Sequence, residues 1–414
     1  MQPTSLLIVG AGKRGTRYAS YALEHPEQAR VVGVAEPQEY CRRHLVEAHG
    51  IAAENVLTDW KQAAACERFA DAALICTQDA MHAEPAIALA ARGYAILLEK
   101  PMAPNEADCR RIVAAVEEHG AMLAVAHVMR YTAYTRQLKG LLDDGRIGEV
   151  ISIQHLEPVG YWHQAHSFIR GHWRNEAESS FMLLAKSCHD LDWMRHMMGR
   201  KVLRVSSFGS LSHFRSENQP PGAAARCLDC QVEPSCPYSA KKIYLGRLAD
   251  GYTGWPVNVV TPEPSEESLT EALRSGPYGR CAYLCDNDVV DHQVVAMEFA
   301  GGRTGVFTMT AFTEHTDRRT RIFGARGEIS GDGKTIRIFD FLHDQQETID
   351  TSAPDGSAAG GHGGGDSGLM RAFIAAVATD DPSKILSGPR ETLETHLSVF
   401  AAERSRREGT VVTI

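Results

Sequence analysis

The stretch LLAKSCHDLDWM, which begins at Leu183, places a lysine, a cysteine, a histidine and two aspartates among apolar residues. On a helix, Lys186, His189, Asp190 and Trp193 are spaced i, i+3, i+4 and i+7, so they share one face. A lysine and a histidine on one face can carry out acid–base chemistry, but charged residues at this spacing are also ordinary on solvated surfaces. The segment alone therefore leaves a wet helix face and a catalytic site both open.

A glycine-rich turn near the start of the chain has the spacing of a dinucleotide-binding loop. It reads G-x-G-x-x-G directly after a predicted strand, and such glycines allow a tight turn and close approach of the backbone to a pyrophosphate. Glu36 closes the second predicted strand, where a carboxylate would bind the adenine ribose hydroxyls. Because that carboxylate would repel a 2′-phosphate, the pattern predicts NAD, although two cations in the loop keep NADP open. The loop residues are Gly10, Gly12, Lys13, Arg14 and Gly15.

A lysine follows the fifth predicted strand, in the sequence Glu99-Lys100-Pro101. Ligands of open α/β sheets bind at the carboxyl ends of the strands, and the proline restricts Lys100 to an extended backbone. An ammonium there can polarise a hydroxyl or carbonyl oxygen, whereas the alternative is a solvated strand end. Because the dinucleotide fingerprint precedes it, we favour the functional interpretation. The predicted cofactor site also includes Thr77, His82, Glu99 and Lys100 itself.

Five cysteines group in the second half of the chain, as Cys227-x2-Cys230-x5-Cys236-Pro followed by Cys281 and Cys285. A short-spaced pair with a third and a distant fourth thiol is typical of tetrahedral zinc. We predict a structural zinc site at Cys227, Cys230, Cys236 and Cys281, with Cys285 as a replacement ligand. An iron–sulfur cluster and unligated thiols are the alternatives.

The elements that must position these residues follow two patterns. Up to about residue 127, short apolar runs alternate with amphipathic helical stretches, which predicts a doubly wound parallel sheet covered on both faces. After residue 130, longer alternating segments predict a mostly antiparallel sheet, with hairpin turns at GGRTG and GDGKT. The predicted strands lie within 5–10, 29–36, 70–77, 94–100, 121–128, 149–160, 201–214, 291–313 and 320–340.

The fold class predicted is therefore α/β, with an N-terminal Rossmann domain over 1–130 and a C-terminal α/β domain over 131–414 that contains a large, mostly antiparallel open sheet. The second domain would bind substrate and form oligomer contacts. Helices are predicted over 369–378 and 391–407, and residues 247–276 look like an exposed insertion.

Composition limits the partners. The 414 residues are 43% hydrophobic and 23% charged, which predicts a globular chain of about two domains. A net charge of −9 without a basic run disfavours nucleic acid and anionic membranes and favours a small molecule. The early apolar run SLLIVGAG is too short to cross a bilayer and lacks signal-peptide flanks, so we expect a cytoplasmic protein whose cysteines are thiols or metal ligands.

These features resemble the Gfo/Idh/MocA oxidoreductases. The resemblance rests on the glycine fingerprint, on AEP after the second strand, on LLEKP after the fifth, and on the H-x-x-D formed by His189 and Asp192. It covers essentially the whole chain. It implies hydride exchange between a nicotinamide and a sugar or cyclitol carbinol.

The resemblance also implies residue roles. The family's strand-end lysine matches Lys100, and its catalytic histidine matches His189, which favours a catalytic role for the opening segment. Many members carry an aspartate four residues before this histidine, where this chain has Ala185 followed by Lys186. Lys186 is thus a candidate catalytic cation that binds a substrate hydroxyl or lowers a neighbouring pKa, with a water-directed lysine as the alternative.

Further candidates would line the substrate cleft. Segment 157–175 combines aromatic rings with donor groups, as a sugar pocket requires, with a surface loop as the alternative. The glycine-rich segment 356–368 could close over the cleft, with a flexible linker as the alternative. The predicted substrate residues are His127, Arg130, Tyr131, His163, His166, Arg170, Trp173, Asp192 and His362, with Arg174 and Asp366 beside them.

Three functions follow from this pattern. The first is an NAD-dependent oxidoreductase acting on a secondary alcohol of a sugar, sugar derivative or cyclitol, in which Lys100 and His189 share proton removal. The second is an NAD-dependent glycosidase that works by transient oxidation, elimination and re-reduction. The third is a non-enzymatic sensor of NAD or sugar, against which the presence of both Lys100 and His189 argues. The open sheet and the resemblance together predict a homo-oligomer.

Overall fold

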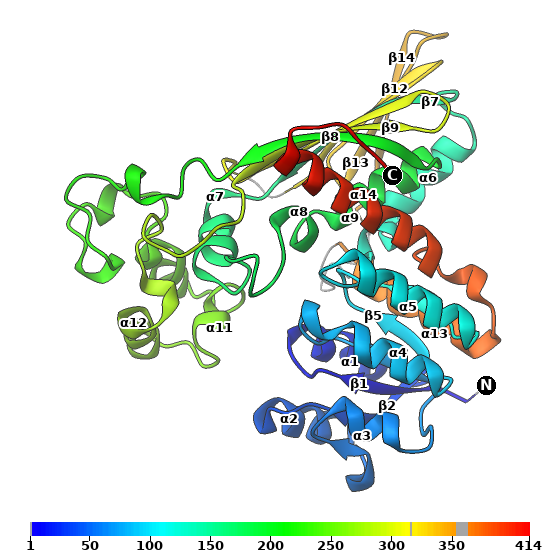
Figure 1. Cartoon of the computed structure of the whole chain (residues 1–414), viewed down its shortest axis with the longest axis horizontal. Coiled ribbons are helices and arrows are strands. Elements are labelled where there is room, and N and C mark those ends of the chain that lie inside the picture. Colours follow the sequence, from blue (N-terminus) through cyan, green and yellow to red (C-terminus); the bar gives the residue numbers. More distant parts are fainter. Residues whose placement is uncertain (1, 315–316, 353–362) are drawn as a thin grey trace.

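A computed structural model describes residues 2–314, 317–352 and 363–414. It has a parallel sheet at the N-terminal end, a larger sheet beyond it, and a lobe to one side (Figure 1). The fold class predicted from the sequence is confirmed. The first sheet has six strands in the order β3-β2-β1-β4-β5-β6.

Helices cover both faces of this first sheet, as its apolar strands require. All six residues of β1 are buried, and the strands pair in parallel register throughout. The two-residue β3 carries no clear apolar run and was absent from the predicted strands. The elements are β1 Thr4–Val9, α1 Lys13–Glu24, β2 Ala29–Ala35, α2 Glu39–His49, β3 Val56–Leu57, α3 Trp60–Ala65, β4 Ala72–Ile75, α4 Ala83–Ala91, β5 Ala95–Leu98, α5 Glu106–Glu118 and β6 Leu123–Val125.

The second sheet has nine strands in the order β14-β13-β12-β11-β7-β10-β9-β8-β15. Among the strand pairs in the described residues, only β7–β10 is parallel, so the expected mostly antiparallel sheet is confirmed. Gly301, Gly302 and Gly333 adopt positive φ at the predicted hairpin turns. The strands are β7 Val150–Pro158, β8 Val202–Ser210, β9 His292–Phe299, β10 Arg303–Thr310, β11 Arg319–Gly324, β12 Gly327–Gly331, β13 Thr335–Asp340, β14 Gln345–Asp350 and β15 Val412–Thr413.

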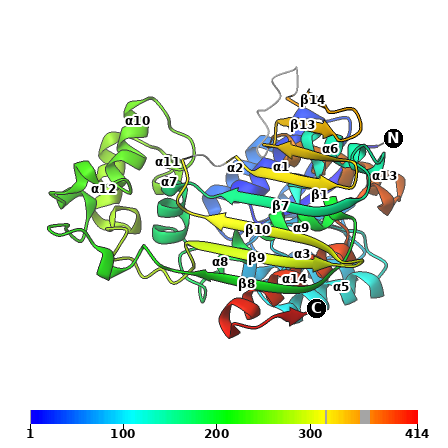
Figure 2. The same cartoon turned by 90° about the horizontal axis from the view of Figure 1, so that it is seen from above.

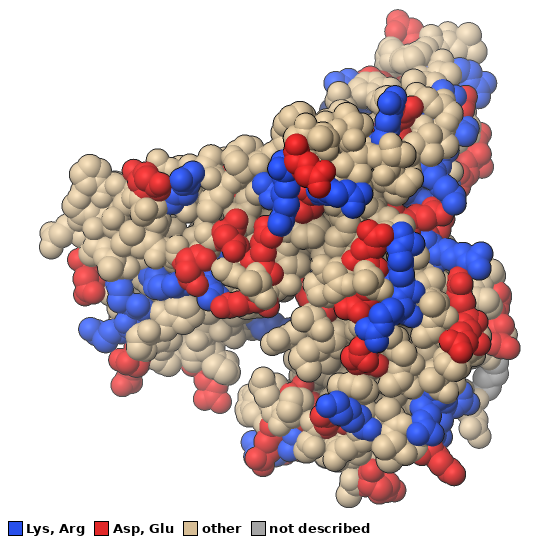
Figure 3. Space-filling model, in the orientation of Figure 1, with Lys and Arg blue, Asp and Glu red and all other residues tan. Residues whose placement is uncertain are grey.

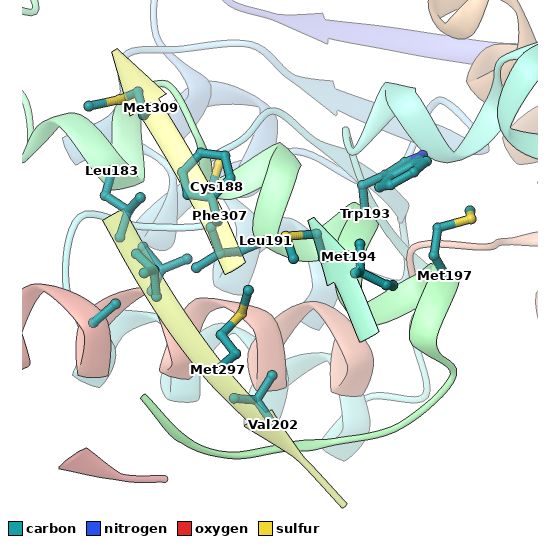
Figure 4. Close-up of a cluster of buried hydrophobic side chains, with 14 of the residues drawn as sticks. Leu183, Cys188, Leu191, Trp193, Met194, Met197, Val202, Met297, Phe307 and Met309 are labelled. Carbon is teal, nitrogen blue, oxygen red and sulfur yellow. The ribbon is translucent and has the colours of Figure 1, made fainter. Parts of the chain in front are cut away.

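Helices pack against one face of the nine-stranded sheet. Side chains of α9 lie against Met297, Phe307 and Met309 of the sheet, with Leu191 and Met194 among them (Figure 4). Figure 2 looks onto the opposite face, in front of which no described helix lies. The helices that follow β6 along the chain and lie outside the lobe are α6 Ala133–Asp143, α7 Tyr161–His163, α8 Met182–Ala185, α9 Cys188–Met198, α13 Gly365–Thr379 and α14 Pro389–Glu408.

A lobe is inserted between β8 and β9, and it is larger than the predicted exposed insertion over 247–276. It has its own buried cluster, which includes Phe214, Tyr244 and Leu269, so much of it is packed rather than solvated. The alternating pattern that marks strands is missing here, which is why the sequence indicated only a loop. Its short helices are α10 Arg247–Ala249, α11 Val257–Val260 and α12 Glu266–Ser275.

Helix α13 comes from the C-terminal part of the chain but packs into the first domain. Its Leu369 and Phe373 share a buried cluster with Leu6 and Ile8 of β1. The first domain is therefore completed by a distant segment. The division at residue 130 stays a prediction.

Candidate active site

The glycine loop lies between β1 and α1, and its three glycines differ in their surroundings. Gly10 has a φ of +90°, and a Cβ there would lie 2.8 Å from the Cys76 carbonyl carbon. A Cβ on Gly15 would lie 2.0 Å from the oxygen of Gly10, whereas one on Gly12 would meet nothing within 4 Å. Gly10 and Gly15 thus allow the tight turn, and Gly12 leaves its outer side open to a ligand.

Glu36 stands directly after β2 and next to this loop. Its buried carboxylate accepts hydrogen bonds of 2.7 Å from the backbone N–H groups of Ala11 and Gln38. A carboxylate in this place suits the adenine ribose hydroxyls of NAD. The residues present therefore fit a dinucleotide.

The two loop cations are already engaged. Arg14 bonds to Glu99 at 2.5 Å and to Asp366 of α13 at 2.8 Å, and Tyr18 donates to Glu99 at 2.7 Å. Burial would raise the pKa of Glu99, but Arg14 outweighs it and holds that pKa below its usual value. Lys13 donates a 2.6 Å hydrogen bond to Asn258 of the lobe. Neither cation is placed as an isolated phosphate ligand.

Lys100 leaves the end of β5 and reaches into the second domain. Its Nζ donates a 2.6 Å hydrogen bond to the backbone oxygen of Ala185. His82 lies between the carbonyls of Thr77 and Pro101, at 3.1 and 2.8 Å, and joins the ends of two strands. Thr77 and His82 therefore shape the cofactor edge of the sheet.

The segment that carries His189 is two helices rather than one. α8 ends at Ala185, Lys186 and Ser187 form the break, and α9 begins at Cys188. The alternative of a solvated helix face is wrong, because His189 and Asp190 are 6% and 0% exposed. Lys186 therefore does not lie on one continuous helix with His189 and Asp190.

His127 lies beneath His189. Their rings meet edge to face with centroids 5.6 Å apart, and His127 Nδ1 is 3.7 Å from the carboxylate of Asp192. Burial lowers the pKa of His127 to about 3, so the ring is neutral at pH 7. The ring of His396, on α14, packs against its other side.

Arg130, Tyr131 and Asp192 form the support of this histidine pair. Arg130 is fully buried and holds Asp192 through two hydrogen bonds of 2.7 and 2.8 Å. Burial would raise the pKa of Asp192, but Arg130 lowers it well below its usual value. The Tyr131 hydroxyl bonds to Ser387 at 2.8 Å. The polar groups of these three side chains thus form hydrogen bonds within the protein.

Lys186 belongs to a buried ionic network that the sequence did not indicate. Its Nζ lies 3.0 Å from Glu157 of β7, and Arg318 lies 2.9 Å from the same carboxylate and 2.5 Å from Asp190. Asp190 also bonds to His155 at 3.0 Å. Two cations and two carboxylates therefore alternate beside His189.

The remaining predicted substrate residues separate into different surroundings. His163 packs on Trp255 of the lobe, with centroids 4.9 Å apart, and burial together with Lys186 lowers its pKa well below the usual range. His166 bonds to the Tyr244 hydroxyl at 2.8 Å, and burial lowers its pKa to about 3. Trp173 packs at the edge of the main core.

Other predicted residues lie away from this group. Arg174 pairs with Asp286 at the surface, and Arg170 faces the cysteine segment of the lobe. Asp366 binds Arg14, as described. His362 falls outside the described residues.

The zinc prediction has no support from ligand geometry. Within residues 2–314, 317–352 and 363–414, no three His, Cys, Asp or Glu side chains are arranged as a set of metal ligands. All ten cysteines are free thiols. The spacing of the cysteines along the chain does not determine how their side chains are oriented in the fold.

Several residues near the site were missed. Glu157, Arg318 and His155 come from strands or their ends, and their partners are distant in sequence. Glu157 offered one signal, since it occupies an inward-facing position of an alternating strand, where a carboxylate needs a partner. Asp79 was also missed. Lys100 and His82 act to lower the pKa of its carboxyl, although burial raises that pKa overall.

A parallel sheet with a glycine loop is joined to a second open sheet, whose strands and packed helices supply polar groups. This arrangement defines a two-domain nucleotide-binding protein of the Rossmann class. The chain belongs to the Gfo/Idh/MocA oxidoreductase family. Residues 4–127 match the model of its NAD-binding Rossmann fold, and residues 139–414 match its C-terminal alpha/beta domain. The resemblance inferred from the motifs is confirmed.

Curated relatives include 2,7-anhydro-N-acetylneuraminate hydratase of Mediterraneibacter gnavus, 31% identical over 50% of this chain and 53% of that one. Inositol 2-dehydrogenase of Streptomyces avermitilis is 30% identical over 50% of this chain and 56% of that one. The matches thus span little more than half of those relatives. Among solved structures, WlbA dehydrogenase of Bordetella pertussis, in complex with NADH and UDP-GlcNAcA, superimposes with a TM-score of 0.68 at 17% identity, covering 100% of this chain and 98% of that one.

Two surface features bear on partners. None of the helices in the described part of the chain has the length and apolar character needed to span a membrane. Basic and acidic side chains are interspersed on the face in Figure 3, and the same view shows a notch between the lobe and the first domain.

Proposed function

We propose that the protein is an NAD-dependent oxidoreductase that oxidises a secondary alcohol of a sugar, sugar derivative or cyclitol. The observation that carries this proposal is the Lys100 ammonium, which leaves the cofactor edge of the first sheet and bonds to the turn that precedes His189. The sugar and cyclitol relatives support the substrate class. When bound, NAD supplies the hydride acceptor.

Lys100 and His189 share the removal of the hydroxyl proton in this proposal. The ammonium binds the reacting oxygen and favours its anionic form, and the imidazole takes the proton. His127 acts as a positioning residue, since its neutral ring packs against His189 and faces Asp192. His163 and His166, which lie against the lobe, would contact the sugar in this proposal.

Lys186 extends the site beyond the reacting carbon. With Arg318 it shares Glu157, and its side chain remains 19% exposed, so it can reach a substrate hydroxyl or carboxylate while Glu157 keeps it in place. We propose that Lys186 fixes the orientation of the sugar ring.

A second candidate is cleavage of a glycosidic or anhydro bond by transient oxidation, elimination and return of the hydride. Two observations favour it. A hydratase of an anhydro sugar is among the relatives, and this chain has Ala185 followed by Lys186 where many members carry an aspartate.

One experiment separates the two reactions. Purified protein is incubated with excess NAD and with free sugars, inositols, anhydro sugars and aryl glycosides, while NADH and released product are followed together. A dehydrogenase gives one NADH for each alcohol oxidised, which is the expected result. Product that accumulates without NADH would establish the second reaction. If neither NADH nor product forms while NAD binding is intact, the protein would instead be a sensor.

We propose NAD rather than NADP as the cofactor. Glu36 opposes a 2′-phosphate, and the guanidinium of Arg14 in the glycine loop is bound by Glu99 and Asp366. Fluorescence titration should show tighter binding of NADH than of NADPH by at least roughly tenfold, and Glu36→Ser should narrow that ratio. Equal binding of both by the wild-type protein would reject the assignment.

We also propose a cytoplasmic homo-oligomer. The ten unpaired thiols suit a reducing compartment. The uncovered sheet face carries Phe208, Val294 and Val306, which are 69%, 37% and 41% exposed, and a second copy would bury them. Analytical ultracentrifugation should show an oligomer that Phe208→Glu weakens. A monomer at all concentrations would contradict this.

A further inference from the structure

Four of the five grouped thiols meet at one place in the lobe. Segments 227–236 and 281–283 come together around a cavity of about 20 Å³, large enough for one atom-sized guest. Its lining includes Cys227, Cys230, Cys236 and Cys281. Cys285 does not line it, and the Cys285 thiol instead donates to the carbonyl of Cys281 at 3.3 Å. The fold thus selects four thiols from five.

N–H groups are directed at these sulfur atoms. Cys227 Sγ accepts from the backbone N–H of Ala240 at 3.5 Å and from Arg170 Nη2 at 3.6 Å. Cys281 Sγ accepts from the side-chain amide of Gln219 at 3.9 Å. A neutral thiol is a weak acceptor, whereas a thiolate is stabilised by such donors. N–H···S contacts of this kind are typical of the surroundings of metal-bound sulfur.

Arg170 supplies the second, independent observation. Its side chain lines the cavity and is 1% exposed, and its other donors reach only the carbonyls of Arg280 and Tyr238. In the part of the chain that the structure describes, no carboxylate pairs with it, and its buried Nη1 has no hydrogen-bond partner. A guanidinium stays charged, and a buried unpaired cation is strongly unfavourable. Thiolates bound to a metal in the cavity would supply an anionic group close to Arg170.

We propose that Cys227, Cys230, Cys236 and Cys281 bind one Zn²⁺ as four thiolates, with Arg170 as the nearby countercharge. Binding releases four thiol protons and leaves a complex of charge −2, which Arg170 partly neutralises. The thiols must turn toward the cavity by rotation about their Cα–Cβ bonds, because they do not form a ligand set as they stand. A four-iron cluster with its sulfides is far larger than this cavity.

The proposed ion would join two segments at the base of the lobe. The same lobe places Asn258 against Lys13 of the glycine loop and Trp255 against His163. Zinc would therefore stabilise the wall that the lobe gives to the active site, without itself taking part in the reaction.

The test uses the 414-residue chain, expressed with and without added zinc. Elemental analysis should find one zinc per chain, and a strong chelator should lower the melting temperature of the wild-type protein by several degrees. Co²⁺ in its place should give the intense visible absorption of a tetrahedral thiolate complex. Cys230→Ser should lose most of the zinc, whereas Cys285→Ser and Cys66→Ser should keep it.

Arg170→Gln should retain zinc but release it to a chelator at least several-fold faster, because the countercharge is gone. Protein that contains no zinc after expression in zinc, and whose melting a chelator does not change, would overturn the proposal. Zinc that survives Cys230→Ser but not Cys285→Ser would overturn the ligand set, and acid-labile sulfide with iron would overturn the metal. The wild-type chelation measurement stands even if Cys230→Ser fails to fold.

Discussion

Lys100 Nζ donates a 2.6 Å hydrogen bond to the main-chain oxygen of Ala185. The two residues are 85 positions apart in the sequence. Lys100 follows β5 of the first sheet, whereas Ala185 lies just before α9, so the bond joins the cofactor edge of the first domain to the turn before α9. Ala185 is also the position at which many family members carry an aspartate. In this chain the partner of Lys100 at that position is thus a backbone oxygen rather than a side-chain carboxylate.

Replacing Lys100 with methionine should abolish turnover and leave NAD affinity within a few fold. The ammonium acts on the reacting oxygen, whereas the glycine loop and Glu36 bind the dinucleotide. Activity is measured with the best substrate of the panel, and NADH binding by fluorescence. Lys61→Met, an exposed change in the same domain, is the control. Near-normal turnover in Lys100→Met would remove this residue from the mechanism.

His189→Ala should lower kcat on the order of 10²-fold or more, as expected for a positioned acid or base. The pH profile distinguishes chemistry from packing, since loss of a proton acceptor removes the corresponding limb of the curve. His189→Gln, which keeps the volume, should behave like the alanine variant. A lowered rate with an unchanged profile would assign His189 to packing.

Glu157→Gln should destabilise the fold by about 3–5 kcal/mol, because it leaves Lys186 and Arg318 together beside one remaining carboxylate. Adding Lys186→Met should restore part of that loss, which urea unfolding of the single and double variants can measure. Glu328→Gln, which breaks an ion pair of exposed Arg321, should cost less than about 1 kcal/mol. Strict additivity would show that the two residues do not interact.

Stability should fall between pH 6.5 and pH 4.5. Burial lowers the pKa of His127 and His166 to about 3 and of His396 to about 4, so the unfolded chain takes up protons there that the native chain does not. The stabilisation is complete above the unfolded pKa of about 6.5 and is lost as the pH decreases. Carboxylates such as Asp192 contribute only at lower pH.

The variant His127→Gln removes one of the histidines that take up a proton only in the unfolded chain over this pH range. The slope of the unfolding free energy against pH in this window should decrease by about 1.4 kcal/mol per pH unit. Urea unfolding at several pH values measures the slope, with the exposed His44→Gln as the control. A slope equal to that of the wild-type protein would mean that His127 is protonated in the native state.

The periodic parts of the fold could be predicted from the sequence. Continuous apolar runs indicated the buried strands β1, β4 and β5, and the glycine spacing located the turn before α1, because both signals are local. Lys100 was found for the same reason, since its position follows from where a strand ends.

The contacts of the site could not be predicted in this way. Glu157, Arg318 and Asp190 come from separate elements, and only the pairing of β7 with β11 brings two of them together. The break at Lys186 is also non-local, since the helical spacing continues through it. The lobe was underestimated because its buried cluster is built from loops and short helices without a regular period.

The first domain takes its last helix from the far end of the chain, and this has a consequence for synthesis. Leu6 and Ile8 pack on Leu369 and Phe373, and Arg14 is bound by Asp366. A ribosome delivers α13 only after it has made more than 360 residues. The apolar surface of the first domain that α13 covers therefore stays exposed to solvent while the rest of the protein is synthesised. A nascent chain interrupted before that point contains the glycine loop but lacks the helix whose Asp366 binds Arg14. Its exposed apolar surface is then open to chaperones and proteases.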